Sequence, residues 1–244
     1  MGNDISLFDQ VQIIYQDETI LVANKPAGLL SIPDGYAPNL PNLKKYLEGK
    51  FGSIWVVHRL DKLTSGLIVF ARNAEAHRYL SLQFENRLVE KKYYCYVVGC
   101  PAWENFVTSF PLKVNADKKH RTLVDLEKGK PSKTAFSVVQ MYTNVSYLEA
   151  IPYSGYTHQI RSHLFALGFP IFGDELYGFK ETRYQNLLPE ELRAGFKGFL
   201  MLCAKQITLD LPMNSQPKTF TIVLPQYFLD FFNTLIKKIL YEND

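Results

Sequence analysis

Residues 58–66 read His58-Arg59-Leu60-Asp61-Lys62-Leu63-Thr64-Ser65-Gly66 and place one carboxylate, that of Asp61, in a short polar segment. The apolar residues 67–70 follow directly and predict a strand that is buried on both faces. Residues 55–57 predict a strand that leads into the segment. Residues 58–66 are therefore expected to form a tight loop between two strands. An acid held in such a loop, at the mouth of a buried strand, is a candidate catalytic carboxylate.

Strand-like patterns recur along the chain, mostly in neighbouring pairs. They cover residues 11–15, 20–23, 55–57, 66–71, 93–98, 133–140, 145–151, 200–210 and 218–224. Apolar residues spaced three and four apart predict helices over 43–48, 74–88, 158–167 and 225–240, the last of them amphipathic. Strands that outnumber helices and pair as hairpins favour an α+β fold, with a mixed and mostly antiparallel sheet, over a doubly wound fold.

Composition permits one large domain or two small ones, and 47% hydrophobic residues suffice for a sizeable core. The net charge is only +3, but the distribution of charge is uneven. Residues 113–133, here called the basic segment, carry seven lysines and arginines against three acids. Such a run is either a solvated loop or an arm that contacts phosphates.

Several common chemistries lack their sequence patterns. His158 and His163 are five residues apart, about 140° around a helix, so they do not converge on one metal ion. The G-x-S-x-G elbow, the Walker A loop and the G-x-G-x-x-G loop do not occur. We therefore expect neither a metal nor a cofactor.

Three cysteines without a C-x-x-C pair or a signal peptide argue for a reducing compartment, so we expect a cytoplasmic protein. No apolar run approaches the roughly 18 residues of a membrane span.

A second polar cluster lies at residues 154–163, where Gly155 precedes a predicted helix start whose free N–H groups suit phosphate. His158, Arg161 and Ser162 are spaced to share one face of that helix. A third cluster, Gly173–Gly178, is typical of a polar turn.

These residues carry a family resemblance. His58–Gly66 resembles the H-R-L-D-x-x-T-S-G signature of the RluA-type RNA pseudouridine synthases. Ile20–Leu29 resembles the family's L-V-V-N-K-P-A-G-L opening, and Lys91-Lys92-Tyr93 its K-x-Y strand. Gly155–Gly178 resembles its segment with H-Q-I-R and G-D-x-L-Y-G. The four motifs span about residues 11–224, so we expect a single catalytic domain over 1–244, without the S4 module of many relatives.

Two positions depart from the family pattern: Tyr156 replaces a usual arginine, and Cys203 a common histidine. The resemblance implies the pseudouridine synthase fold, with a central cleft, and isomerisation of uridine in rRNA or tRNA. Since substrate and product share one formula, no cofactor is implied. Asp61 matches the catalytic aspartate, and Arg161 the arginine that pairs with it. Tyr93 matches the tyrosine that lies against the target base.

The remaining site residues are expected to bind RNA. Arg59 is expected to hold the flipped-out nucleotide or the displaced RNA. His58 is expected to fix the loop by a hydrogen bond, and Lys25 and the basic segment to contact phosphates. The RNA-binding set is completed by Thr64, Lys91, His158 and Gln159.

RNA is thus the expected partner, and a monomer without an obligate protein partner is the expected state. The alternative is a catalytically inactive RNA-binding or RNA-folding protein on the same scaffold. An ester hydrolase is a more distant alternative. Intact Asp61, Tyr93 and Arg161 favour the enzyme.

Overall fold

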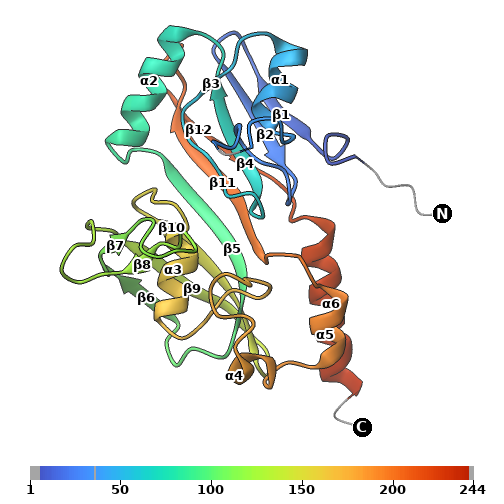
Figure 1. Cartoon of the computed structure of the whole chain (residues 1–244). Helices are drawn as coiled ribbons and strands as arrows, with labels where there is room; N and C mark the ends of the chain where they lie inside the picture. Colours follow the sequence, from blue (N-terminus) through green and yellow to red (C-terminus); the bar gives the residue numbers. More distant parts are fainter. Residues whose placement is uncertain (1–5, 36, 242–244) are drawn as a thin grey trace. The chain divides into compact units, whose positions relative to one another are not determined.

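The computed structural model describes residues 6–35 and 37–241, with the side chains of 238–241 left out. The chain divides into two compact units (Figure 1). Unit 1 holds the chain up to Lys91 and Ala204–Val223, and unit 2 holds Lys92–Cys203 and the chain from Leu224 onwards. The single domain expected from the sequence stays a prediction.

Unit 1 is built on a sheet in the order β1 (Gln12–Gln16), β2 (Ile20–Lys25), β4 (Ser65–Ala71) and β11 (Leu202–Asp210). The short β3 (Trp55–Val56) also pairs with β4, and β12 (Pro217–Thr221) pairs with β11. The β2–β4 pairing is antiparallel and sets Lys25 opposite Gly66. All seven residues of β4 are buried, which confirms the prediction from the apolar run.

Two helices, α1 (Leu43–Phe51) and α2 (Ala74–Glu85), complete unit 1. The Asn73 side chain accepts a hydrogen bond from the Ala76 N–H at 2.8 Å, so Asn73 caps the start of α2. The helix ends at Glu85, three residues earlier than expected, because Arg87 adopts a left-handed backbone with φ 59°.

Unit 2 contains antiparallel strands in the order β5 (Glu90–Val98), β10 (Val145–Pro152), β9 (Thr134–Met141) and β6 (Asn105–Thr108). The first two residues of β5 belong to unit 1. A small two-stranded sheet, β7 (Leu112–Lys113) and β8 (Leu123–Val124), lies in and beside the basic segment. The helices are α3 (Gln159–Ala166), α4 (Thr182–Gln185), α5 (Glu190–Gly195) and α6 (Gln226–Tyr241).

Aromatic side chains form the core of unit 2. The Phe231 ring on α6 lies 4.5 Å from Phe172, 4.8 Å from Tyr96 and 5.0 Å from Phe196, measured between ring centroids. Phe228 and Leu235 share this buried face of α6. Phe232 lies away from this face and is 40% exposed, because one residue turns a helix by about 100° from Phe231.

The observed elements agree with the predicted α+β fold and its mostly antiparallel pairing. Five short elements were not predicted: β6, β7, β8, α4 and α5. Among the described residues, no helix is both long and apolar enough to cross a membrane.

Candidate active site

In unit 1, the loop that carries Asp61 is held on both sides of this residue. The Ser31 hydroxyl donates to the Leu60 carbonyl at 2.8 Å and accepts the Leu60 N–H at 3.1 Å. The Gly28 N–H donates to the Lys62 carbonyl at 2.8 Å. Asp61 itself is half-buried, and its carbonyl accepts the Thr64 N–H at 3.1 Å. Residues 25–31 therefore act as a clamp that fixes the backbone around the candidate carboxylate.

Lys25 belongs to this clamp. Its side chain is buried, and Nζ donates to the carbonyls of Pro26 at 2.9 Å, Leu29 at 2.8 Å and Lys62 at 3.1 Å. Burial lowers the pKa of Lys25 to about 7, while the nearby charge of Asp61 acts in the opposite direction. Three carbonyls match the three N–H donors of an ammonium group. The phosphate contact predicted for Lys25 is therefore corrected: its donors are used by the backbone, inside the unit.

Gly66, the last residue of the loop motif, permits a close approach of two strands. Its backbone has φ 115°, a conformation that side chains rarely adopt. A Cβ atom at this position would overlap the backbone of Ala204 in β11. Glycine at the end of the motif is thus required by the packing of β4.

His58 fixes the start of the loop. Its Nε2 accepts the Val69 N–H at 2.9 Å, and its ring stacks on Phe84 with 4.6 Å between centroids. Burial, together with the charge of Lys91, lowers the pKa of His58 to about 3, so the ring is neutral. The expected loop-fixing hydrogen bond is confirmed. Burial also lowers the pKa of Lys91 to about 8.

Two cations flank Asp61 at the surface. Arg59 and Lys62 are exposed, and both line a cavity of about 80 Å³ together with Leu60 and residues 30–35. Thr64 is 2% exposed, and its hydroxyl has no hydrogen-bond partner in the part of the chain that the structure describes. A buried hydroxyl of this kind suits a bound water or substrate group.

In unit 2, Arg161 is held by an acid of the same unit. Its Nε donates to Asp174 Oδ2 at 2.7 Å and its Nη2 to Asp174 Oδ1 at 2.9 Å. The side chains are 6% and 1% exposed, respectively. This bidentate pair fixes the plane of the guanidinium group. The Gly173–Gly178 cluster, predicted as a polar turn, thus supplies the carboxylate that orients Arg161. An acid in a Gly-flanked turn is the one sequence signal that points to this pairing.

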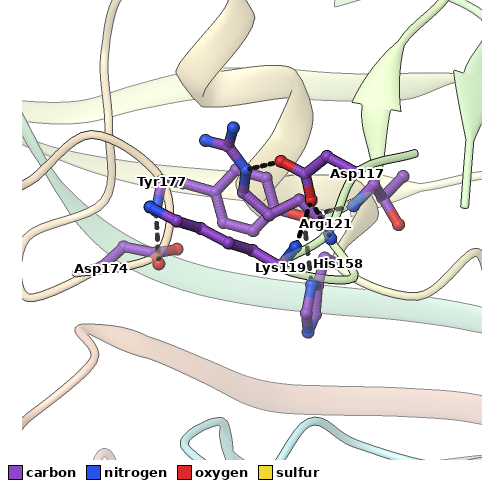
Figure 2. Close-up of polar contacts among 7 residues, drawn as sticks. Asp117, Lys119, Arg121, His158, Asp174 and Tyr177 are labelled. Atoms are coloured by element: carbon purple, nitrogen blue, oxygen red, sulfur yellow. Dashed lines mark hydrogen bonds and ion pairs between the residues drawn. The ribbon is translucent and has the colours of Figure 1, made fainter. Parts of the chain in front are cut away.

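Tyr177 lies beside this pair and also contacts His158. Its backbone N–H donates to Asp174 Oδ1 at 3.2 Å, as Figure 2 shows, and its ring lies 5.0 Å from Arg161 Cζ. His158 Nδ1 lies 3.1 Å from the Tyr177 hydroxyl. His158 precedes α3 in a left-handed conformation, φ 56°, so the predicted helix start is one residue too early.

Gln159 is a structural residue in its unit. The side chain is 4% exposed; it donates to the Lys133 carbonyl at 3.0 Å and to the Thr134 hydroxyl at 2.9 Å. Its Oε1 accepts from the Ser154 hydroxyl at 2.8 Å and from the Tyr156 N–H at 3.2 Å. The RNA contact predicted for Gln159 is therefore corrected, because its amide is occupied on both ends.

Tyr93 is half-buried on β5, opposite Ala150 of β10. Its neighbours Lys92 and Tyr94 both reach Glu149: the Tyr94 hydroxyl donates to Oε2 at 2.7 Å, and Lys92 Nζ lies 3.5 Å from the same atom. Burial and this hydrogen bond raise the pKa of Tyr94 to about 12.

Comparison with known proteins agrees with this geometry. The family described as RNA pseudouridylate synthase matches residues 19–166. A protein from Vibrio parahaemolyticus named dual-specificity RNA pseudouridine synthase RluA is 39% identical over 176 residues, which are 70% of each chain. A protein of the same name from Escherichia coli K12 is 34% identical over 209 residues, 85% of this chain and 90% of that one.

Solved structures give the same picture of the fold. Human RNA Pseudouridylate Synthase Domain Containing 4 superposes with a TM-score of 0.72 at 24% identity, covering 91% of this chain and 92% of that one. Human RNA Pseudouridylate Synthase Domain Containing 1 gives 0.71 at 25% identity, covering 91% and 87%. With four ordered motifs, a matching fold and relatives at 34–40% identity, the chain belongs to the RluA-type family of RNA pseudouridine synthases, the isomerases that convert uridine in RNA.

Proposed function

We propose that this pseudouridine synthase isomerises uridines in structured rRNA or tRNA, with Asp61 as its catalytic carboxylate. The observation that carries the proposal is the clamp around Asp61. Backbone groups of Leu60 and Lys62, on either side, are held by Ser31, Gly28 and Lys25. A carboxylate fixed in this way meets a reacting sugar and base without first losing conformational freedom.

The reaction breaks the N1–C1′ bond of uridine and joins C5 to C1′ after the base rotates. The proton on C5 leaves and N1 takes up a proton, so that product and substrate have one formula. Asp61 acts beside the sugar and base as the ionised acid. The exposed Arg59 and Lys62 give the approach to Asp61 a positive charge, which suits an RNA whose target nucleotide is flipped out.

Tyr93 and Arg161 are proposed to complete the active site on the strength of the motif match. Tyr93 would stack on the uracil, and Arg161 would take the role of the family arginine that pairs with the catalytic aspartate. Asp174 supports this role because it orders the Arg161 side chain before any substrate binds.

More than one RNA target is proposed, because the relatives carry the name dual-specificity RNA pseudouridine synthase. A monomeric state and a cytoplasmic location stay predictions from the sequence.

The proposal is tested with unmodified tRNA and rRNA transcripts labelled with tritium at uridine C5. The wild-type protein is expected to release tritium, and Asp61→Asn to release none while binding the same transcript within about threefold. The control is Asp230→Asn, which changes an exposed acid on α6 and is expected to keep wild-type turnover. Turnover in Asp61→Asn would remove Asp61 from the chemistry. A wild-type protein that binds these transcripts without tritium release would instead support the inactive RNA-binding alternative.

Arg161→Ala is expected to lower the rate of tritium release by at least tenfold, since a loss of about 1.4 kcal/mol of transition-state stabilisation corresponds to a factor of ten. A wild-type rate in this variant would exclude Arg161 from the site.

A further inference from the structure

Tyr177 contacts two parts of unit 2 that are far apart in the sequence. Its hydroxyl accepts the Thr122 N–H at 2.7 Å, which ties it to the basic segment (Figure 2). Its ring and backbone meet Arg161 and Asp174, with 5.0 Å from the ring centroid to Arg161 Cζ and 3.2 Å from its N–H to Asp174 Oδ1. Tyr177 is fully buried, so one fixed side chain joins the basic segment to the arginine proposed for the active site.

The part of the basic segment next to Thr122 is a preformed turn. Asp117 accepts the backbone N–H groups of Lys119 at 3.0 Å and Arg121 at 3.1 Å, and the Arg121 Nε at 2.7 Å (Figure 2). His120 takes a left-handed conformation with φ 54°. The turn is therefore shaped by its own contacts, and the Thr122 N–H sets where it sits relative to Tyr177.

The lysines of the basic segment are suited to phosphate. Arg121 is paired with Asp117, and Lys113 lies 3.7 Å from Asp125. Five further lysines are exposed and have no acid partner among the described residues: Lys118, Lys119, Lys128, Lys130 and Lys133. Exposed and unpaired ammonium groups of this kind bind the phosphates of RNA in a salt-dependent manner.

We propose that Tyr177 is a positioning residue, whose hydroxyl holds the lysine-bearing turn in register with Arg161. RNA phosphates bound by Lys118 and Lys119 are then held at a fixed place relative to the arginine. This inference rests on the proposed function, because it takes RNA as the substrate. It assigns Tyr177 to substrate binding and not to the chemical step.

Tyr177→Phe tests the role of the hydroxyl, since it keeps the ring beside Arg161. It removes both the acceptor for Thr122 and the partner of His158 Nδ1, whereas Asp117→Asn perturbs the turn alone. With tritiated transcripts, KM is expected to rise about three- to tenfold, the range for one net hydrogen bond, while kcat stays within about twofold of wild type. Tyr184→Phe is the matched control. It removes a hydroxyl from another buried tyrosine of unit 2, and its KM is expected to be unchanged.

A merely structural role is distinguished by coupling to the lysines. The double variant Lys118→Ala/Lys119→Ala is expected to raise KM and to reduce the dependence of log KM on log salt by about one to two units. Adding Tyr177→Phe to this variant is expected to change KM by less than about twofold, because the turn no longer has phosphates to position.

Asp117→Asn gives the same test from the other side of the turn, without changing Tyr177. It is expected to raise KM and to leave kcat unchanged, and it replaces Tyr177→Phe as the test if that variant does not fold.

Three results would overturn the inference: an unchanged KM in both Tyr177→Phe and Asp117→Asn, a loss in kcat alone, or full additivity with the lysine variant. Failure of the proposed function has a different signature, since wild-type protein would then release no tritium from either transcript.

Discussion

Asp174→Asn is expected to destabilise the protein strongly, because it leaves the Arg161 guanidinium without its bidentate carboxylate. The pair is made through 2.7 Å and 2.9 Å contacts by side chains that are 6% and 1% exposed. Breaking a buried pair by removal of one partner costs about 3–5 kcal/mol. For a chain of this size, that corresponds to a fall in Tm of roughly 6–20 °C. Urea titration followed by circular dichroism measures the loss of free energy of unfolding.

A surface pair next in sequence provides the control. Glu175 lies 2.6 Å from Lys180, but the side chains are 45% and 67% exposed, respectively. Glu175→Gln is therefore expected to cost less than about 1 kcal/mol. The double variant Arg161→Met/Asp174→Leu is expected to regain most of the stability while remaining inactive, since an apolar pair replaces the buried ions. A loss below about 1 kcal/mol in Asp174→Asn, or a double variant as unstable as the single one, would refute this reasoning.

Further predictions concern unit 1. Gly66→Ala is expected to destabilise the protein by several kcal/mol or to prevent folding, because the new Cβ would overlap Ala204. Gly49 lies in α1 with open space around it, so Gly49→Ala is expected to stabilise the protein by about 0.5–1 kcal/mol. Thermal unfolding compares the two, and equal Tm values would contradict the packing argument. Lys25→Met removes the donor of three backbone carbonyls, so it is expected to lower the free energy of unfolding by about 2 kcal/mol or more and to lower kcat as well. An unchanged urea midpoint would argue against the clamp. The pKa of His58 is lowered to about 3 in the folded protein, so between about pH 6.5 and 3 the unfolded state binds one proton that the folded state does not. The free energy of unfolding is therefore expected to fall as the pH drops through that range, by up to about 1.4 kcal/mol per pH unit. His58→Gln should flatten that pH dependence of the urea midpoint, and an unchanged slope would count against a neutral, buried ring.

Short-range sequence patterns predicted those parts of the structure that are determined by residues close together in the chain. The apolar run 67–70 predicts β4 because a strand buried on both faces needs no alternation. Asn73 predicts the start of α2 because its side chain caps a helix only three residues away. The loop at Asp61 was predicted for the same reason, since both of its flanking strands were visible in the sequence.

Contacts between residues far apart in the sequence could not be predicted from these short-range patterns. The Arg161–Asp174 pair joins a helix to a turn, and no spacing rule selects Asp174 from the other acids. Lys25 was predicted to contact phosphate, as a cation within a motif of the proposed RNA-binding site. Its burial follows from the register of β2 with β4, which brings it opposite Gly66 and within reach of the Lys62 carbonyl. The two-residue strands β7 and β8 are too short for any periodicity to show.

The motif residues of unit 1 therefore separate into those that act on the substrate and those that hold the loop. The hydrogen bonds of the clamp reach the backbones of Leu60 and Lys62 and not the carboxylate between them. Asp61→Asn leaves these backbone hydrogen bonds in place, so it should abolish turnover with a smaller loss of stability than Lys25→Met. Changes at Lys25 or Gly66 remove part of the support, so they should reduce turnover and stability together. The ratio of these two losses, measured for each motif residue, is what distinguishes a catalytic residue from a positioning one in this protein.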